Sequence, residues 1–255
     1  MNCNKRLNSS MFVIYLVLFN VIIIPASNAT TSESLTYYTE IYPPSNFLEN
    51  NELVGLSVET LKLLWQKMNV KEQKIHIVPW ARGYHNVLNK PNSMLFTMAR
   101  TPKRETLFKW VGPLYFAEHV LIAKHDFTDD INDITDAYQY IIAAIKNDVS
   151  EITLLEKNFP DEHIVRISQL RQAILMLQNK RIDLMIVSRT SLKGILDEHN
   201  LTMDDIKIVF SINKIGNYYA FNVNTPDILI EQYQQAFDQI KEERQKINYK
   251  YGVFQ

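Results

Sequence analysis

The sequence has little cysteine and little glycine, and neither sign of charge dominates. Its one cysteine, Cys3, precedes an apolar run, so the rest of the chain holds no disulfide. Six glycines are scattered through 255 residues, and none builds a glycine-rich phosphate-binding loop. The 27 basic and 28 acidic residues nearly balance, which argues against nucleic-acid binding because that function usually needs a basic face. Without disulfides, stability must come from a hydrophobic core, and the length suffices for one.

Motifs for catalysis and metal binding are also missing. Ser150 and Ser188 have no G-x-S-x-G elbow around them, and the six histidines show no metal-ligand spacing. The acidic stretch 129–133 resembles part of a calcium loop but lacks its glycine and terminal glutamate, which favours a solvated linker. We therefore expect a protein that is not an enzyme and that uses no cofactor or metal.

The first 29 residues have the layout of a secretory signal peptide. Lys5 and Arg6 precede the apolar run 11–24, and small residues stand at Ser27 and Ala29. An uncleaved N-terminal anchor is the alternative, although this run is short for a transmembrane helix. Cleavage after residue 29 would remove two basic residues and leave 25 basic against 28 acidic ones. We expect a secreted chain of net charge −3 without a membrane anchor.

Strand-like and helix-like segments alternate along the rest of the chain, which predicts an α/β protein with parallel sheets. The polar, acidic passage that begins at residue 125 indicates a crossing into a second domain. The expected strands are 34–39, 74–79, 93–98, 120–124, 140–145, 164–167, 184–187, 206–210 and 217–223. The expected helices are 57–68, 82–89, 191–199, one capped by Ser168 and a long one from Pro226.

The most informative stretch is 96–104, where an apolar strand ends in small polar residues, a turn with proline and Arg104. Small ligands bind at strand ends of open α/β sheets. A guanidinium placed there offers a forked, permanently charged partner to a carboxylate or phosphate. Arg104 is therefore a candidate ligand-binding residue. The structural alternative is that it caps a helix or pairs with Glu105 or Asp129.

This stretch, continued through 108–113 to Tyr115, resembles the signature of bacterial solute-binding proteins of family 3, the polar amino-acid-type periplasmic receptors. Segments 42–44, 53–56 and 172–187 resemble further family segments in the same order. The resemblance implies a type 2 periplasmic-binding-protein fold with two lobes, each a mostly parallel sheet flanked by helices, joined by two hinge strands. We expect residues 30–124 to form the first part of lobe 1 and 125–215 to form lobe 2. Residues 216–255 would return to lobe 1 and end in the C-terminal helix.

The resemblance also implies a ligand site. Arg104 matches the arginine that holds a ligand α-carboxylate, Thr97 and Ala99 match positions on the same rim, and Tyr42 matches an aromatic that covers the ligand. Two positions depart from the family pattern. Asp148-Val149-Ser150 replaces the usual Gly-Thr-Thr anchor, and Ser188 replaces the acidic partner of the ligand ammonium.

These departures argue against an ordinary amino-acid ligand, because a buried ammonium without a partner would cost several kcal/mol, roughly. With Arg82, Arg100 and Arg104 near one lobe's strand ends, an anionic solute is expected. Trp80 and Tyr42 are candidates to stack on it, and Trp110 is better explained by packing. Arg82 and Arg100 are equally consistent with surface arginines whose stems cover apolar neighbours.

The function implied by the resemblance is a monomeric periplasmic receptor that closes on a small, carboxylate-bearing solute. It would deliver that solute to the inner-membrane permease of an ABC-type transporter. The alternative is a ligand-sensing module that signals in trans to a membrane kinase or cyclase.

Overall fold

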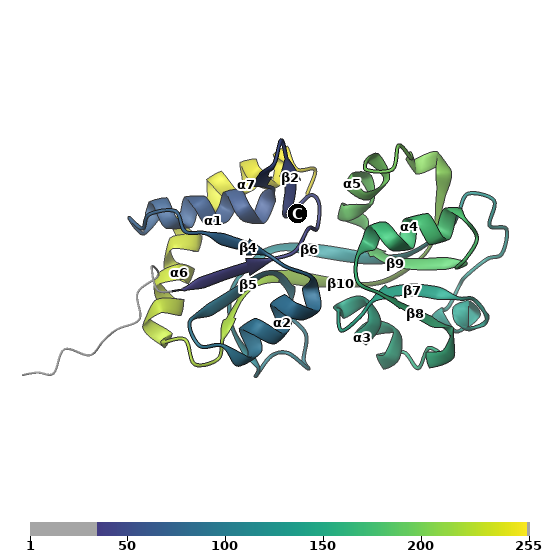
Figure 1. Cartoon of the computed structure of the whole chain (residues 1–255), viewed down its shortest axis with the longest axis horizontal. Coiled ribbons are helices and arrows are strands. Elements are labelled where there is room, and N and C mark those ends of the chain that lie inside the picture. The colour runs from purple at the N-terminus through teal and green to yellow at the C-terminus, as the bar shows by residue number, and fades with distance from the viewer. Residues whose placement is uncertain (1–34, 254–255) are drawn as a thin grey trace, which may run out of the picture.

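The computed structural model describes residues 35–253, which form two α/β lobes side by side (Figure 1). The expected signal peptide, 1–29, lies outside these residues. One hydrogen-bonded sheet of eight strands runs through both lobes in the order β4-β1-β5-β10-β6-β9-β7-β8. No helix within 35–253 is both long and apolar enough to cross a membrane.

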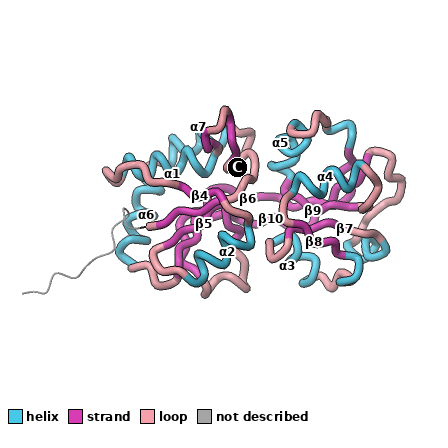
Figure 2. Tube along the Cα trace, in the orientation of Figure 1, coloured by secondary structure: helices cyan, strands magenta, loops and turns pink. Residues whose placement is uncertain are grey.

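The first lobe is built on three parallel strands, with β1 between β4 and β5. Helices lie on both sides of the sheet (Figure 2), and a small hairpin, β2–β3, precedes the first helix. The elements are β1 (Thr36–Thr39), β2 (Phe47–Glu49), β3 (Glu52–Val54), α1 (Leu56–Lys67), β4 (Ile75–Ile77), α2 (Trp80–Asn89), β5 (Ser93–Ala99), α6 (Asp227–Gln239) and α7 (Lys241–Lys250).

The second lobe repeats this plan, with β7 parallel to both β8 and β9. Short 3₁₀ turns link several of its elements. These elements are η2 (Ile134–Gln139), β7 (Ile142–Ile145), α3 (Val149–Glu156), η3 (Asp161–His163), β8 (Ile164–Ile167), α4 (Leu170–Gln178), β9 (Leu184–Ser188), η4 (Arg189–Ser191), α5 (Leu192–Asp197) and η5 (Met203–Asp205).

Two long antiparallel strands, β6 (Phe108–Lys124) and β10 (Ile206–Asn222), pair with each other from end to end and join the lobes. Residues 217–221 of β10 pair with β5 of the first lobe, whereas residues 119–123 of β6 pair with β9 of the second lobe. The expected separate strands at 120–124, 206–210 and 217–223 are therefore wrong in extent. Residues 211–216 in the middle of β10 are mostly polar and partly exposed, which suggested a loop between two strands. In the structure they continue the strand between the lobes.

Two helical expectations also need correction. Residues 149–156 form α3, capped by the Asp148 side chain, where the sequence analysis expected no helix. The C-terminal helix is divided at Ile240, which ends α6 and begins α7. The predicted two-lobed α/β fold itself is confirmed.

Within residues 35–253, buried apolar side chains form three clusters, and one of them spans the junction between the lobes. One cluster packs α1 and α6 onto the sheet of the first lobe, with Trp65 only 1% exposed. A second contains Trp80 and Leu95 of the first lobe together with Ile145 and Ile174 of the second. The apolar packing is therefore continuous across the junction between the lobes.

Candidate functional site

The loops after the strands of one lobe contact those of the other. Pro43, which follows β1, packs against Gly194 of α5 so closely that a Cβ placed on this glycine would lie 2.7 Å from the proline Cβ. Lys103 and Glu156 form an ion pair of 3.1 Å between the lobes. Side chains and backbone groups of both lobes therefore meet at this junction, which makes it the candidate ligand site.

Arg104 lies at the centre of this junction and is only 1% exposed. Its guanidinium donates to the carbonyl of Ala99 in its own lobe (3.2 Å) and to that of Asn147 in the other lobe (3.1 Å). The rings of Trp80 and Tyr84 lie 5.2 and 5.3 Å from it. Trp80 donates to the same Asn147 carbonyl at 3.0 Å. Arg104 and Trp80 thus connect the lobes through one backbone oxygen.

The charge of Arg104 is only partly compensated. Burial lowers the pKa of this guanidinium, and the nearby Asp148 carboxylate opposes that effect. Its Nε atom has no hydrogen-bond partner among residues 35–253, which is unusual for a buried charged donor. The group therefore retains donor capacity for an additional acceptor.

Asp148 is the N-cap residue of α3. It accepts from the Ser150 backbone N–H (3.4 Å) and hydroxyl (3.1 Å), and the Ser150 hydroxyl accepts from the Ile145 N–H at 3.2 Å. Ser150 is therefore engaged within its own lobe. The chain itself supplies a negative charge to this helix N-terminus.

Glu40 faces Asp148 from the first lobe. Burial, together with the Asp148 charge, raises the pKa of this carboxyl well above its ordinary value. No ion pair or hydrogen bond of the Glu40 carboxylate is found within the described part of the chain. Glu40 was not among the residues expected from the sequence, although it stands two positions before the expected Tyr42.

The other expected residues also lie at the junction. Tyr42, in the loop after β1, is partly buried beside the Ser191 hydroxyl, and this burial raises the pKa of its phenol. Ser188 is fully buried, and its hydroxyl bonds that of Thr190 at 2.6 Å. Ser188 is paired in the sheet with His119, whose pKa is lowered mainly by burial. Ser188 itself brings no charge to the junction.

On the first side, Thr97 and Ala99 serve mainly internal structure. The Thr97 hydroxyl donates to the Asn46 side-chain oxygen (2.8 Å) and contacts the Ser57 hydroxyl (2.6 Å). Ala99 contributes the carbonyl that accepts from Arg104. Both positions therefore support the junction, and a direct ligand contact for either stays a prediction.

The structure does not bring the three expected arginines together. Arg100 pairs with Glu105 at the surface and stacks over Trp110 and Tyr218. Arg82 is exposed on the first turn of α2. Only Arg104 combines burial with contacts to both lobes. Asn147, which the sequence analysis missed, carried no sequence signal because it acts through its backbone carbonyl.

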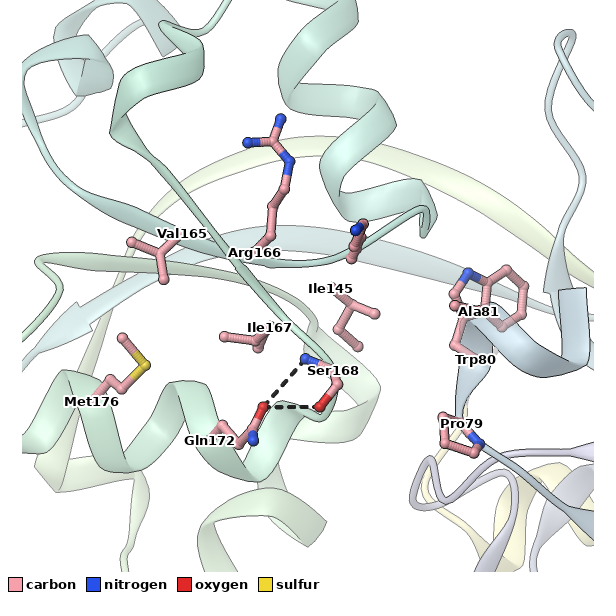
Figure 3. A pocket seen from close by; sticks show the side chains of 11 residues that line it. Pro79, Trp80, Ala81, Ile145, Val165, Arg166, Ile167, Ser168, Gln172 and Met176 are labelled. Carbon is pink, nitrogen blue, oxygen red and sulfur yellow. Dashed lines mark hydrogen bonds between the residues drawn. The ribbon is translucent and has the colours of Figure 1, made fainter. Parts of the chain in front are cut away.

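Two cavities of about 470 Å³ each open along the junction. Figure 3 shows the first, with Pro79 and Trp80 on one side and Ile145, Ser168 and Gln172 on the other. These volumes lie within the ordinary range of ligand pockets, about 300–1,000 Å³. The space between the lobes is large enough for a small solute.

Comparisons with known proteins agree with this geometry. The model of the family described as bacterial extracellular solute-binding proteins, family 3, matches residues 35–253. A comparison with curated protein sequences found no match. Members of this family bind small solutes, and most of the similar structures reported below are binding proteins rather than enzymes.

Three solved structures illustrate the similarity of the fold. A histidine kinase sensor domain similar to periplasmic binding proteins gives a TM-score of 0.77 at 16% identity, covering 87% of this chain and 97% of that one. The substrate-binding protein of an amino acid ABC transporter gives 0.73 at 21% identity, covering 85% and 98%. The arginine-, lysine-, histidine-binding protein ArtJ from Geobacillus stearothermophilus gives 0.75 at 13% identity, covering 85% and 94%.

The identities are low enough that these structures show the fold alone, whereas the family model spans nearly all the described residues. The chain belongs to the bacterial extracellular solute-binding proteins, family 3.

Proposed function

We propose that the protein is a periplasmic receptor that closes its two lobes on a small solute carrying a carboxylate and an amino group, for delivery to an ABC-type permease. The observation that carries this proposal is Arg104, which is buried at the junction, bonded to both lobes and left with an unpartnered Nε. A forked guanidinium with a spare donor suits a carboxylate. Glu40 supplies a partner for the amino group.

Ligand binding would act through Arg104. A ligand carboxylate would take over the N–H that now donates to Asn147 and would also engage Nε. Because Asn147 belongs to the second lobe, this exchange couples the ligand to the position of that lobe. The exchange removes one contact between the lobes, so closure requires that the ligand also contact the second lobe, as in other hinge proteins.

The charges at the junction favour a zwitterion over the anion expected from the sequence. Asp148 already lies near the Arg104 guanidinium, and Glu40 adds a second carboxylate. A ligand with only negative charge would have to approach both acidic groups. An ammonium placed beside Glu40 would relieve the repulsion between Glu40 and Asp148.

The similar structures are compatible with two uses of such a receptor. One is the binding protein of an amino acid transporter, and another takes part in glutathione import in Streptococcus mutans. The similarity to a histidine kinase sensor domain keeps signalling in trans as the second candidate. Both uses share the ligand site, so the ligand is the first thing to establish.

The proposal is tested by a thermal-shift screen of the exported protein against amino acids, short peptides, dicarboxylates and amines. A ligand at a hundred times its Kd stabilises by about 2.7 kcal/mol, or roughly 5–11 °C for this chain length. Stabilisation by compounds with both an amino and a carboxylate group supports the proposal. Stabilisation by dicarboxylates or amines alone, or by nothing, would contradict it.

A further inference from the structure

The two cavities at the junction are parts of one groove. Pro79, Ile145 and Ser168 line both of them. The groove lies between the β4–α2 connection of the first lobe and the ends of β7 and β8 in the second. Each part alone has about 470 Å³, already a typical ligand volume. The groove, which Trp80 lines at one end, therefore exceeds what a single amino acid fills.

The rim of the groove is apolar and exposed on the side of the first lobe. Ile41, Leu48 and Ile77 all line the second cavity, and they are 41%, 50% and 41% exposed. Three large exposed apolar side chains on one rim mark a binding surface rather than a solvated one. Ile145 and Leu170 of the second lobe complete the apolar wall.

The charges along the groove are distributed unequally. The second cavity is lined by Glu40, Glu198 and Arg171, whose Nε donates to Gln169 at 2.8 Å. Neither glutamate has an ion pair in the part of the chain that the structure describes. The first cavity is lined by Lys146 and Arg166.

Arg166 is already paired with Glu151 and Asp161, whereas Lys146 has no ion pair within residues 35–253. Lys146 directly precedes Asn147, the residue bonded by Arg104 and Trp80. The groove therefore has the unpaired cation Lys146 at one end, and the carboxylates Glu40 and Glu198, with Arg171, at the other.

Polar groups on the shared wall suit a peptide backbone. Ser168 donates from its backbone N–H and its hydroxyl to the Gln172 side-chain oxygen, both at 3.2 Å (Figure 3). This pair is exposed to the groove, so its remaining donor and acceptor capacity is open to amide groups of a ligand.

We infer that the solute is a short linear peptide that lies along this groove, with its amino terminus at Glu40 and Glu198 and its carboxyl terminus at Lys146. The inference rests on the proposed function and specifies its substrate class. Apolar side chains of the peptide pack on Ile41, Leu48 and Ile77. Peptide length and both charged termini are then determinants of affinity.

The test is calorimetric titration of the exported protein with each of the twenty amino acids and with Ala-Leu, Ala-Leu-Ala and Ala-Leu-Ala-Leu. The inference predicts that at least one peptide binds tenfold or more tightly than the best amino acid. It also predicts that acetylating the amino terminus of that peptide weakens binding at least tenfold. Equal or tighter binding of a single amino acid would overturn the inference and leave the proposed function standing. Binding of neither class would contradict the proposed function itself.

Matched variants locate the effect in the groove. Ile77→Ser and Glu198→Gln are expected to weaken peptide binding about threefold to tenfold each, with amino-acid binding unchanged. Ile228→Ser, at a 55% exposed isoleucine on α6, and Glu231→Gln on the same helix serve as controls. If both control variants weaken peptide binding as much as the groove variants do, the groove assignment is overturned.

Discussion

Replacing Arg104 by lysine separates the charge of this residue from its forked geometry. The arginine makes two hydrogen bonds to carbonyl oxygens, one in each lobe, and is 1% exposed. A lysine has a single ammonium group in place of the forked guanidinium, so it can keep only one of these two hydrogen bonds. Hydrogen bonds from a charged donor contribute about 1.5–3 kcal/mol each, so we expect Arg104→Lys to lower the free energy of unfolding by about 1.5–3 kcal/mol. At about 2–4 °C per kcal/mol, Tm of the ligand-free protein falls by roughly 3–12 °C.

The assay is a pair of melting curves, without ligand and with the tightest solute from the screen. Ligand-induced stabilisation should be largely lost in Arg104→Lys, because a carboxylate loses the two-pronged contact. Arg100→Lys is the matched control, since Arg100 pairs with Glu105 at the surface. A Tm within 1 °C of the wild type, or an unchanged ligand response, would refute the role of Arg104 as the group that joins both lobes and the ligand.

Three further predictions concern neighbouring parts of the molecule. Burial and Asp148 raise the pKa of Glu40, so the ionised group destabilises the folded protein at neutral pH. Glu40→Gln should raise the ligand-free Tm at pH 8, with the difference vanishing toward about pH 4. Gly194→Ala places a Cβ 2.7 Å from Pro43, so it should weaken ligand affinity and increase the radius of gyration in solution scattering with ligand. Tyr233→Phe removes a buried hydrogen bond of 2.7 Å to Tyr37 and should cost about 1 kcal/mol in chemical denaturation.

Each of these predictions has a contradicting result. A Tm difference for Glu40→Gln that is constant with pH would show that charge is not its cause. Lys193→Ala, at an exposed position beside Gly194, controls for the Gly194 variant, and equal effects of the two would remove the claim of a close lobe contact. If Tyr233→Phe leaves the free energy of unfolding unchanged, the hydrogen bond between the two phenols makes no net contribution to stability.

The fold was largely predictable because its elements carry local signals. The apolar positions of α1 recur at helical spacing, and β8 spans the expected residues 164–167. The long strands β6 and β10 were not, because polar residues in their middle segments, such as Glu118 and Asn213, indicated loops between separate strands. Helix α3 is short, and its apolar residues gave no clear helical period.

The site was predictable only where a side chain acts in its own right. Arg104 carried a recognisable pattern, and its position at the junction agrees with that expectation. Glu40 and Asp148 were missed as a pair because residues more than a hundred positions apart meet only in the folded chain. Arg100 was equally consistent with a ligand role and with a surface arginine, and its ion pair with Glu105 holds it at the surface. Tertiary pairing, which one sequence does not reveal, decides between such residues.

A crystal structure of the protein saturated with its tightest-binding solute tests the proposed site most directly. We expect a ligand carboxylate within hydrogen-bond distance of the Arg104 guanidinium and a ligand amino group beside Glu40. We also expect the Arg104 hydrogen bond to Asn147 to be exchanged for one to the ligand. A ligand bound elsewhere, or bound between the lobes with the Arg104–Asn147 contact intact and Glu40 without a ligand partner, would contradict the proposed site.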